Sequence, residues 1–307
     1  MTRARAVSVP EPGGPEVLRV LEREVREPGP AEIRIAVRAA AVNPTDIGLR
    51  AAGAQGIDPP WVPGMDAAGV VESVGEGAAR LASGDEVMAA VLPRRPEGGA
   101  QAELLVVPEA SAVPVPDGAS LPEASTLPMN GLMALLGLEL LGLEPGATLA
   151  VTGGAGLLAS YVIVLAKAQG LRVIADAKPE DAALVEGFGA DEVVPRGDFA
   201  AAVGGRADGV YDTALLRRDA LDAIRDGGGI AVVRAWEGDD PGRGIAVHPV
   251  RVATVLERTD WLEQLRELAS GGRVPLRVAG EYPPEQAADA HRVMEAGGLR
   301  GRAVIVF

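Results

Sequence analysis

The stretch Val151-Thr-Gly-Gly-Ala-Gly-Leu-Leu-Ala-Ser160 decides the fold. A strand-like run, "ATLAVT" at 147–152, leads into its glycines, and a helix-like run, "GLLASYVIVLAKAQG" at 156–170, follows them. Gly154-Ala-Gly156-Leu-Leu-Ala159 fits the pattern G-x-G-x-x-G/A, which holds the pyrophosphate of a dinucleotide at a helix N-terminus. Because a strand precedes the motif and a helix follows it, it predicts a nucleotide site rather than a plain turn.

Each small residue of this turn has an expected role. Gly154 makes the bend, Gly156 lets the backbone approach phosphate oxygens without a Cβ in the way, and Ala159 permits close packing of helix on strand. Two bulky residues at the start of the helix are expected to narrow the phosphate cradle. The turn residues predicted to contact the cofactor are Gly153, Gly154, Gly156, Leu157 and Leu158.

The end of the next strand, "LRVIADA" at 171–177, predicts which dinucleotide binds. Sites for NAD usually place an acidic residue there, where it binds the ribose 2′-hydroxyl. Here Ala177 takes that position and Lys178 follows it, while Asp176 lies one residue early and is expected to point to the other face. Arg196, just past the third strand, would add a second cation. A small residue with nearby cations suits a 2′-phosphate, so we expect NADPH, held by Ala177, Lys178 and Arg196.

The order of strand-like and helix-like runs along the chain predicts an α/β fold with two domains. Residues 1–118 hold short β-branched runs separated by glycine and proline, as in an irregular or barrel-like sheet. Residues 119–255 alternate strands with helices, one of them expected at 217–228, which implies parallel βαβ units and a doubly wound sheet. Residues 256–307 return to mixed character and close on a strand, "RAVIVF", expected to rejoin one of the earlier sheets.

Composition excludes several classes of function. The 307 residues include no cysteine and only two histidines, which leaves no thiol catalysis, no Cys-ligated zinc and little basis for a His-based metal site. A net charge of −14 argues against nucleic acid or an anionic membrane as partner. We see no run of apolar residues long enough for a membrane span and no apolar signal core at the N-terminus, so we expect a cytoplasmic protein.

A set of motifs in fixed order resembles the medium-chain dehydrogenase/reductase superfamily, most closely its zinc-independent quinone oxidoreductase (zeta-crystallin-like) branch. These motifs are "AAVNPTDI" (40–47), "VPGMDAAGVVESVG" (62–75), "GDEVMA" (84–89), "LPMNGLMAL" (127–135), the glycine turn, "GADEVV" (189–194), "VYDT" (210–213) and "RDGGGIAVV" (225–233). The resemblance implies a GroES-like catalytic domain formed by residues 1–118 and 256–307. It also implies an inserted Rossmann NADPH-binding domain at 119–255, and homodimers.

The same resemblance implies hydride transfer without a metal. Zinc-dependent relatives carry Cys where Asn43 stands and a His-Glu pair where Met65-Asp66 stand, and neither an amide nor a thioether replaces those zinc ligands. We expect Asn43 to be catalytic, its amide donating to a developing oxyanion, with an Asn-Pro helix cap as the structural alternative. Asp46 is expected to cap a helix. Asn130 stands where relatives often have Thr beside the cofactor, and is expected to bind it.

The predicted function is transfer of hydride from NADPH to a quinone or a related α,β-unsaturated carbonyl, a small-molecule acceptor. The alternative is a catalytically weak NADPH-binding protein, a sensor or structural protein that keeps the fold. Two features motivate this alternative. The turn has the bulky "GLLA" where relatives have glycines, and no tyrosine lies near the expected acceptor position. A third hypothesis, an enoyl-thioester reductase, calls for a basic entry that the acidic composition does not favour.

Overall fold

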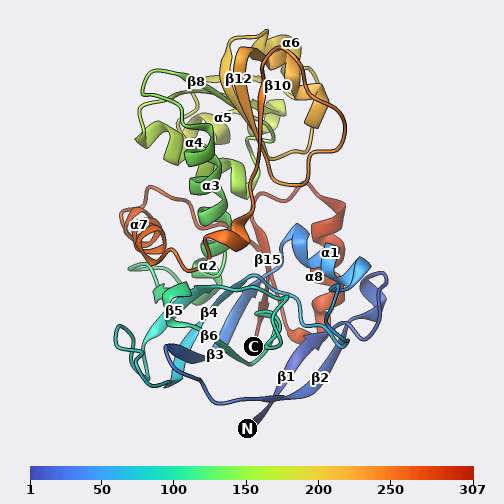
Figure 1. The fold of residues 1–307 in the computed structure, drawn as a ribbon, viewed down its shortest axis with the longest axis vertical. Helices are drawn as coiled ribbons and strands as arrows, with labels where there is room; N and C mark the ends of the chain where they lie inside the picture. Colours follow the sequence, from blue (N-terminus) through green and yellow to red (C-terminus); the bar gives the residue numbers. More distant parts are fainter. The chain divides into compact units, whose positions relative to one another are not determined.

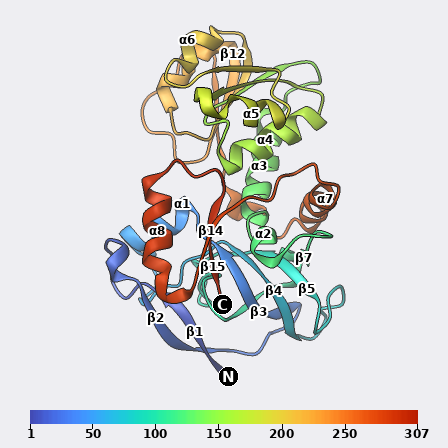
Figure 2. The same ribbon diagram turned by 180° about the vertical axis from the view of Figure 1, so that it is seen from behind.

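A computed structural model describes residues 1–307, and the chain divides into two compact units (Figures 1 and 2). Unit 1 consists of Met1–Met129 and Leu256–Phe307, and unit 2 of Asn130–Val255. Both ends of the chain therefore belong to the same unit. The assignment of the two units to catalysis and to cofactor binding stays a prediction.

Unit 1 is built on a seven-stranded sheet in the order β14-β15-β3-β4-β5-β7, with β6 paired to β3. The central strand β3 is long and β-branched on its inner face, where Ile33, Ile35 and Val37 are buried. A separate antiparallel pair is formed by β1 and β2. The strands are β1 (Thr2–Ser8), β2 (Arg19–Val25), β3 (Glu32–Ala41), β4 (Asp66–Val74), β5 (Glu86–Ala90), β6 (Leu104–Pro108), β7 (Ala112–Pro114), β14 (Val278–Tyr282) and β15 (Arg302–Val306).

The C-terminal tail completes this sheet. β15 runs antiparallel to β3, with Val304 opposite Ala41, which confirms that the closing strand rejoins an earlier sheet. In Figure 2, α8 runs beside α1, and the two are in contact. The α-helices of unit 1 are α1 (Pro44–Ala52), α2 (Leu121–Ala124), α7 (Thr259–Ser270) and α8 (Ala287–Ala296). A capping box starts α2, since Ser120 and Glu123 bond reciprocally.

Unit 2 is a six-stranded parallel sheet in the order β10-β9-β8-β11-β12-β13. This is the order of a doubly wound fold, in which the direction of winding reverses between β8 and β11. The predicted Rossmann fold is therefore confirmed. The strands are β8 (Thr148–Val151), β9 (Arg172–Ala177), β10 (Glu192–Pro195), β11 (Ala207–Asp212), β12 (Ile224–Val232) and β13 (Ala246–Pro249).

Helices link these strands. Figure 1 shows α4 and α5 on one side of the sheet. The α-helices are α3 (Pro128–Leu141), whose first two residues belong to unit 1, α4 (Leu157–Ala168), α5 (Ala182–Gly187) and α6 (Phe199–Val203). α3 fits closely against β11, because the hydroxyl of Tyr211 donates to the carbonyl of Met133 at 2.5 Å. A Cβ on Gly137 would lie 2.2 Å from the Tyr211 ring, so only glycine permits this approach.

The predicted helix at 217–228 is wrong. A 3₁₀ helix covers Arg217–Ala223, and β12 begins at Ile224 and runs through Gly227 and Gly228 and on to Val232. Gly227 has φ +73°, and a Cβ on Gly228 would lie 2.5 Å from the Ile224 side chain. Glycine disfavours a helix interior, and the pairing of β12 with both β11 and β13 outweighs the helical spacing of the apolar residues.

One helical stretch, Leu121–Leu141, is long and apolar enough to cross a membrane by length and composition alone. Its most apolar window is 83% buried inside the protein, as is usual for a core helix.

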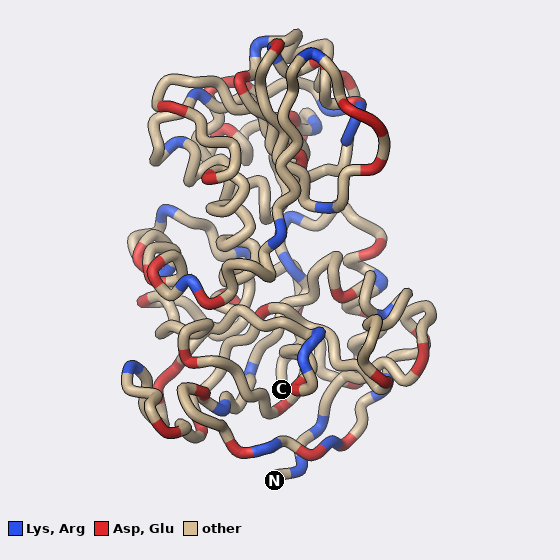
Figure 3. The backbone as a smooth tube through the Cα atoms, in the orientation of Figure 1, with Lys and Arg blue, Asp and Glu red and all other residues tan.

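The charged residues are spread over both units of the chain. Figure 3 shows acidic and basic residues interspersed along both units.

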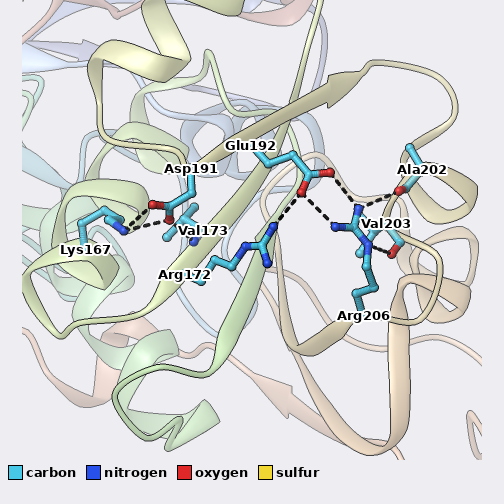
Figure 4. A network of polar contacts seen from close by, with 8 residues as sticks. All are labelled: Lys167, Arg172, Val173, Asp191, Glu192, Ala202, Val203 and Arg206. Carbon is cyan, nitrogen blue, oxygen red and sulfur yellow. Dashed lines mark hydrogen bonds and ion pairs between the residues drawn. The ribbon is translucent and has the colours of Figure 1, made fainter.

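An ion-pair network fixes the amino ends of β9 and β10 (Figure 4). Lys167 donates to both carboxylate oxygens of Asp191 at 2.8 Å, and Asp191 accepts the backbone N–H of Val173 at 2.7 Å. Beside it, Glu192 binds Arg206 through two contacts of 2.8 Å and Arg172 at 3.1 Å. The network anchors the amino end of β9. The predicted cofactor residues lie at the carboxyl end of the same strand.

Candidate functional site

The glycine turn between β8 and α4 has the shape of a phosphate cradle. Gly153 has φ +69°, a backbone conformation that favours glycine, and the N–H of Gly156 donates to the carbonyl of Gly153 at 2.8 Å. A Cβ on Gly154 would lie 2.9 Å from the carbonyl oxygen of Asp176, and one on Gly156 would lie 3.1 Å from that of Gly153. Gly156 is the N-cap of α4, so the positive end of this helix faces the turn.

The two leucines of the turn differ in exposure. Leu157 is 1% exposed and belongs to the core, whereas Leu158 is partly exposed. Any narrowing of the cradle by a side chain therefore falls to Leu158. Ala159 is fully buried where helix meets strand, and Asn130, near the start of α3, is 1% exposed.

Asp176 does not point away from the turn, as its place in the register had predicted. Its Oδ1 accepts the backbone N–H of Gly153, and its carbonyl accepts the N–H of Gly154 at 3.0 Å. The carboxylate and the carbonyl of Asp176 thus both bond to the glycine turn. Burial raises the pKa of the Asp176 carboxyl, while the Gly153 N–H and the charge of Arg196 lower it.

A cavity of about 440 Å³ opens beside these residues at the carboxyl ends of β9, β10 and β11. Arg196 and Asp176 both line it, whereas Lys178 does not. The Lys178 side chain is 52% exposed and lies 3.8 Å from Glu180, and Ala177 is buried. The residues lining the cavity are Asp176, Arg196, Gly197, Asp198, Phe199, Ala200, Ala201, Ala214, Leu216, Asp219 and Asp222.

Sequence reasoning missed the pair at the switch point, Thr152 and Asp212. The Thr152 hydroxyl donates to Asp212 Oδ1 at 2.8 Å, and Asp212 also accepts the N–H groups of Leu216 at 3.0 Å and Arg217 at 2.7 Å. The loop it holds is strained, since Leu215 and Arg217 have φ of +62° and +54°. A buried carboxylate at the end of a strand next to the glycine turn was the signal available in "VYDT".

In unit 1 a second polar cluster is buried around Asn43. The Asn43 amide donates through Nδ2 to Asp66 Oδ2 at 2.7 Å, and its Oδ1 accepts from Arg302 Nε at 2.8 Å. Asn43 and Asp66 are both fully buried. Arg302, the first residue of β15, is 9% exposed, and its side chain is part of the cluster.

Asp46 holds the same cluster from the first turn of α1. Its Oδ2 accepts the backbone N–H of Asn43 at 2.7 Å, which makes it part of the predicted helix cap. Its Oδ1 accepts the N–H of Gly64 at 2.8 Å. Burial raises the pKa of Asp46 to about 6, against the opposing effect of these two bonds and of Arg302.

Asp66 is the most strongly perturbed acid of the cluster. Burial raises the pKa of its carboxyl to about 7, while the bonds from Met129 N–H, at 2.6 Å, and Asn43 lower it. Both of its oxygens accept hydrogen bonds, which is the geometry of an ionised carboxylate. Its neighbour Met65 is 6% exposed and packs in the core.

The glycine turn of unit 2 suits a dinucleotide, and the Asn43 cluster of unit 1 does not suit a metal ion. The glycine cradle and adjoining cavity suit a pyrophosphate and the adenosine end of a cofactor. The Asn43 cluster offers an amide and carboxylates that already hold hydrogen bonds, and the cation of Arg302 lies among them. A fixed cation at this position opposes the binding of a divalent ion.

Two family models match the chain. Residues 29–117 match the alcohol dehydrogenase GroES-like domain, and residues 188–305 match the zinc-binding dehydrogenase model. The first match lies in unit 1, and the second covers the latter part of unit 2 together with the C-terminal tail.

Curated relatives cover nearly all of the chain. The 2-methylene-furan-3-one reductase of Solanum lycopersicum is 30% identical over 98% of this chain and 78% of its own length. The chloroplastic NADPH-dependent alkenal/one oxidoreductase of Arabidopsis thaliana is 30% identical over 95% and 77%. The quinone oxidoreductase of Rattus norvegicus is 26% identical over 99% and 98%.

Solved structures of similar sequence have the same fold as this chain. A mycobacterial protein solved in complex with NADPH superimposes with a TM-score of 0.86 at 27% identity, covering 99% of this chain and all of that one. A structure described as an NAD-dependent alcohol dehydrogenase gives a TM-score of 0.84 at 30% identity, covering 99% of both chains. The chain therefore belongs to the medium-chain dehydrogenase/reductase superfamily, in its zeta-crystallin-like quinone oxidoreductase branch.

Proposed function

We propose that this protein is an NADPH-dependent reductase of quinones or α,β-unsaturated carbonyls that works without zinc. The observation that carries the proposal is the buried cluster of Asn43, Asp66 and Arg302, in which a guanidinium and an amide meet. The curated relatives above are named as reductases and oxidoreductases, one of them NADPH-dependent. A catalytically weak sensor or structural protein is therefore not favoured.

NADPH supplies the hydride when bound, and the protein supplies position. The glycine turn would hold the pyrophosphate at the N-terminus of α4, with Gly153, Gly154 and Gly156 at the contact. Arg196 lines the adjoining cavity, which supports it as the cation that meets a 2′-phosphate. Lys178 has an exposed side chain that does not line this cavity. Its cofactor role and those of Asn130, Leu157, Leu158 and Ala177 stay predictions.

Asn43 has the role of a positioning residue in this proposal. Arg302 and Asp66 clamp the two ends of its amide, so its orientation is fixed before any acceptor arrives. Donation by this amide to a developing oxyanion stays a prediction. Reduction of a quinone or enone needs little acid catalysis, since these acceptors are already electrophilic, and a proton can come from water.

A homodimer would join through the edge of the unit 2 sheet. β13 pairs with β12 on one side only, so its other side offers backbone groups to a second copy. We propose this dimer and a cytoplasmic location. A monomer mass by light scattering would contradict the dimer.

The test is NADPH oxidation with a panel of naphthoquinones and enones, with and without a metal chelator. We expect turnover that the chelator leaves unchanged, and slower turnover with NADH. Tight NADPH binding without turnover of any acceptor would contradict the proposal. Loss of activity on chelation would contradict its zinc-independent part.

A further inference from the structure

A cavity of about 460 Å³ in unit 1 is separate from every residue assigned above. The two-stranded sheet β1–β2 forms one side of it, and the loops around Val62 and Gly98 lie close by. The residues lining it are Met1, Ser8, Leu21, Glu22, Arg23, Glu24, Val25, Arg26, Pro60, Val62, Pro96, Glu97 and Val106. Its volume is in the range of small-molecule sites, roughly 300–1,000 Å³.

Arg23 is the unexplained group in this cavity. It lies on β2 opposite Ala4, on the same face of the strand as Leu21 and Val25. Its Nε is buried and has no hydrogen-bond partner. Burial lowers the pKa of Arg23, which means that the protein does not compensate the charge fully. A buried donor without a partner is costly, and the guanidinium that carries it belongs to a side chain that lines the cavity and has no acid of the protein bonded to it.

Glu97, the acid whose charge acts on Arg23, has a hydrogen bond to another arginine. It raises the pKa of Arg23 through its charge, and its carboxylate accepts from Arg26 Nε at 2.9 Å. Arg26 also holds Glu32 at 2.8 Å. The second arginine of the cavity is thus neutralised within the protein, and Arg23 is the cation available to a ligand.

The loop beneath Arg23 is shaped to receive its guanidinium. Gly98 has φ +69°, and a Cβ there would lie 2.9 Å from Arg23 Nη1 and 3.0 Å from the Val62 side chain. Only glycine leaves room for the guanidinium to lie against the loop. The position of Arg23 is therefore built by two segments that are far apart in the sequence.

The walls define the chemical class of ligand. Six apolar residues suit an apolar body: Leu21, Val25, Pro60, Val62, Pro96 and Val106. The planar fork of a guanidinium matches a carboxylate, and the acids Glu22 and Glu24 at the rim disfavour a ligand with more than one negative charge. We propose that this cavity binds a small organic monocarboxylate, with its carboxylate on Arg23 and its apolar body against Val62 and Val106.

Calorimetric titration of the full chain, saturated with NADPH, tests this site. The probes are 4-phenylbutanoate and its uncharged match, 4-phenylbutanamide. We expect the carboxylate to bind at least about tenfold more tightly than the amide, the scale of one charge-assisted contact. Arg23→Gln should abolish the difference. Arg19→Gln, on the same strand but outside the cavity lining, should preserve it.

Leu21→Glu provides a second variant should Arg23→Gln fold poorly, which thermal unfolding will show. Leu21 is 37% exposed, so the change is tolerable, and it places a negative charge on the same face of β2. It should weaken binding of the carboxylate at least about tenfold more than binding of the amide, which loses only an apolar contact. Equal binding of the two probes to the wild type, no binding of either, or an unchanged preference in both variants would overturn the proposal.

Discussion

Two groups of polar residues, one in each unit, underlie the proposed chemistry at the scale of single residues. In unit 2, the buried Asp176 and the exposed Arg196 line the same cavity, where we expect a ribose with or without a 2′-phosphate to be distinguished. In unit 1, Asn43 is held by Asp66 and Arg302. The roles that the sequence predicts for Asn43, Lys178 and Arg196 stay predictions, and no sequence pattern indicates that Asp176 accepts a hydrogen bond from Gly153.

We predict that substitutions of Arg196 and Lys178 weaken NADPH binding to different extents. Arg196→Gln should weaken NADPH binding by about 1–3 kcal/mol, the scale of a charge-assisted phosphate contact, and NADH binding much less. Lys178→Ala should act in the same direction but by less, because Lys178 does not line the cavity. Fluorescence titration of both cofactors measures this, and equal losses for NADPH and NADH would reject the 2′-phosphate role.

Asp66 predicts a pH dependence. With a pKa of about 7, its carboxyl takes up a proton as the pH falls through neutrality, and one of the bonds from Asn43 or Met129 is then lost. We expect kcat/KM of the wild type to fall on the acid side of about pH 7, and Asp66→Asn to lack this limb. Cofactor affinity, measured over the same range, is the control. An identical acid limb in both proteins would contradict the role of Asp66.

At the scale of elements, sequence periodicity works where a strand or helix has its own apolar pattern. The predicted strands at 147–152 and 171–177 and the predicted helix at 156–170 appear as β8, β9 and α4, within a few residues of their expected bounds. It fails at 217–228, where glycines and pairing on both sides make β12. It also misses β2, since the polar "RVLEREV" shows no buried face until it pairs with β1.

The contact between α3 and β11 predicts a loss of stability on a one-carbon change. Gly137→Ala should cost about 1–3 kcal/mol, because its Cβ would meet the Tyr211 ring at 2.2 Å. Gly187→Ala in α5 is the matched control. Nothing lies within 4 Å of its Cβ, so it should be neutral or slightly stabilising. Denaturant unfolding measures both, and an equal effect of the two changes would contradict close packing at Gly137.

At the scale of the whole molecule, two buried ionisable groups have opposite effects on how the free energy of unfolding changes with pH. Asp66 has a folded pKa of about 7 against 3.8, so its contribution to stability is fully present below 3.8 and is lost as the pH rises through 7. His291 has the opposite sign. Burial and the charge of Arg50 lower its pKa from 6.5 to about 3, so its contribution is present above 6.5 and is lost as the pH falls toward 3.

His291→Gln isolates this second effect. The His291 ring faces Arg50 at 3.4 Å and Gln101 at 3.4 Å, and Arg50 in turn binds Glu295. Between about pH 6.5 and pH 5 the wild type should lose about 2 kcal/mol more unfolding free energy than the variant. Guanidinium unfolding at the two pH values measures the difference. Parallel losses in the two proteins would show that His291 does not titrate as its burial requires.

The family and the doubly wound fold followed from ordered motifs, because the glycine turn and its flanking runs are local in sequence. The buried clusters did not, since Arg302 and His291 reach Asn43 and Arg50 from the far end of the chain. Such contacts depend on β15 and α8 completing unit 1, which no local pattern reveals.

The central claim is that this protein transfers hydride from NADPH to a quinone or to the carbon–carbon double bond of an α,β-unsaturated carbonyl. NADPH labelled with deuterium at C4 and incubated with an enone gives the most direct test, read by mass spectrometry of the product. We predict one deuterium in each reduced product and one NADPH oxidised for each acceptor reduced, with a chelator present. Unlabelled product, or NADPH bound tightly and never oxidised, would contradict the account.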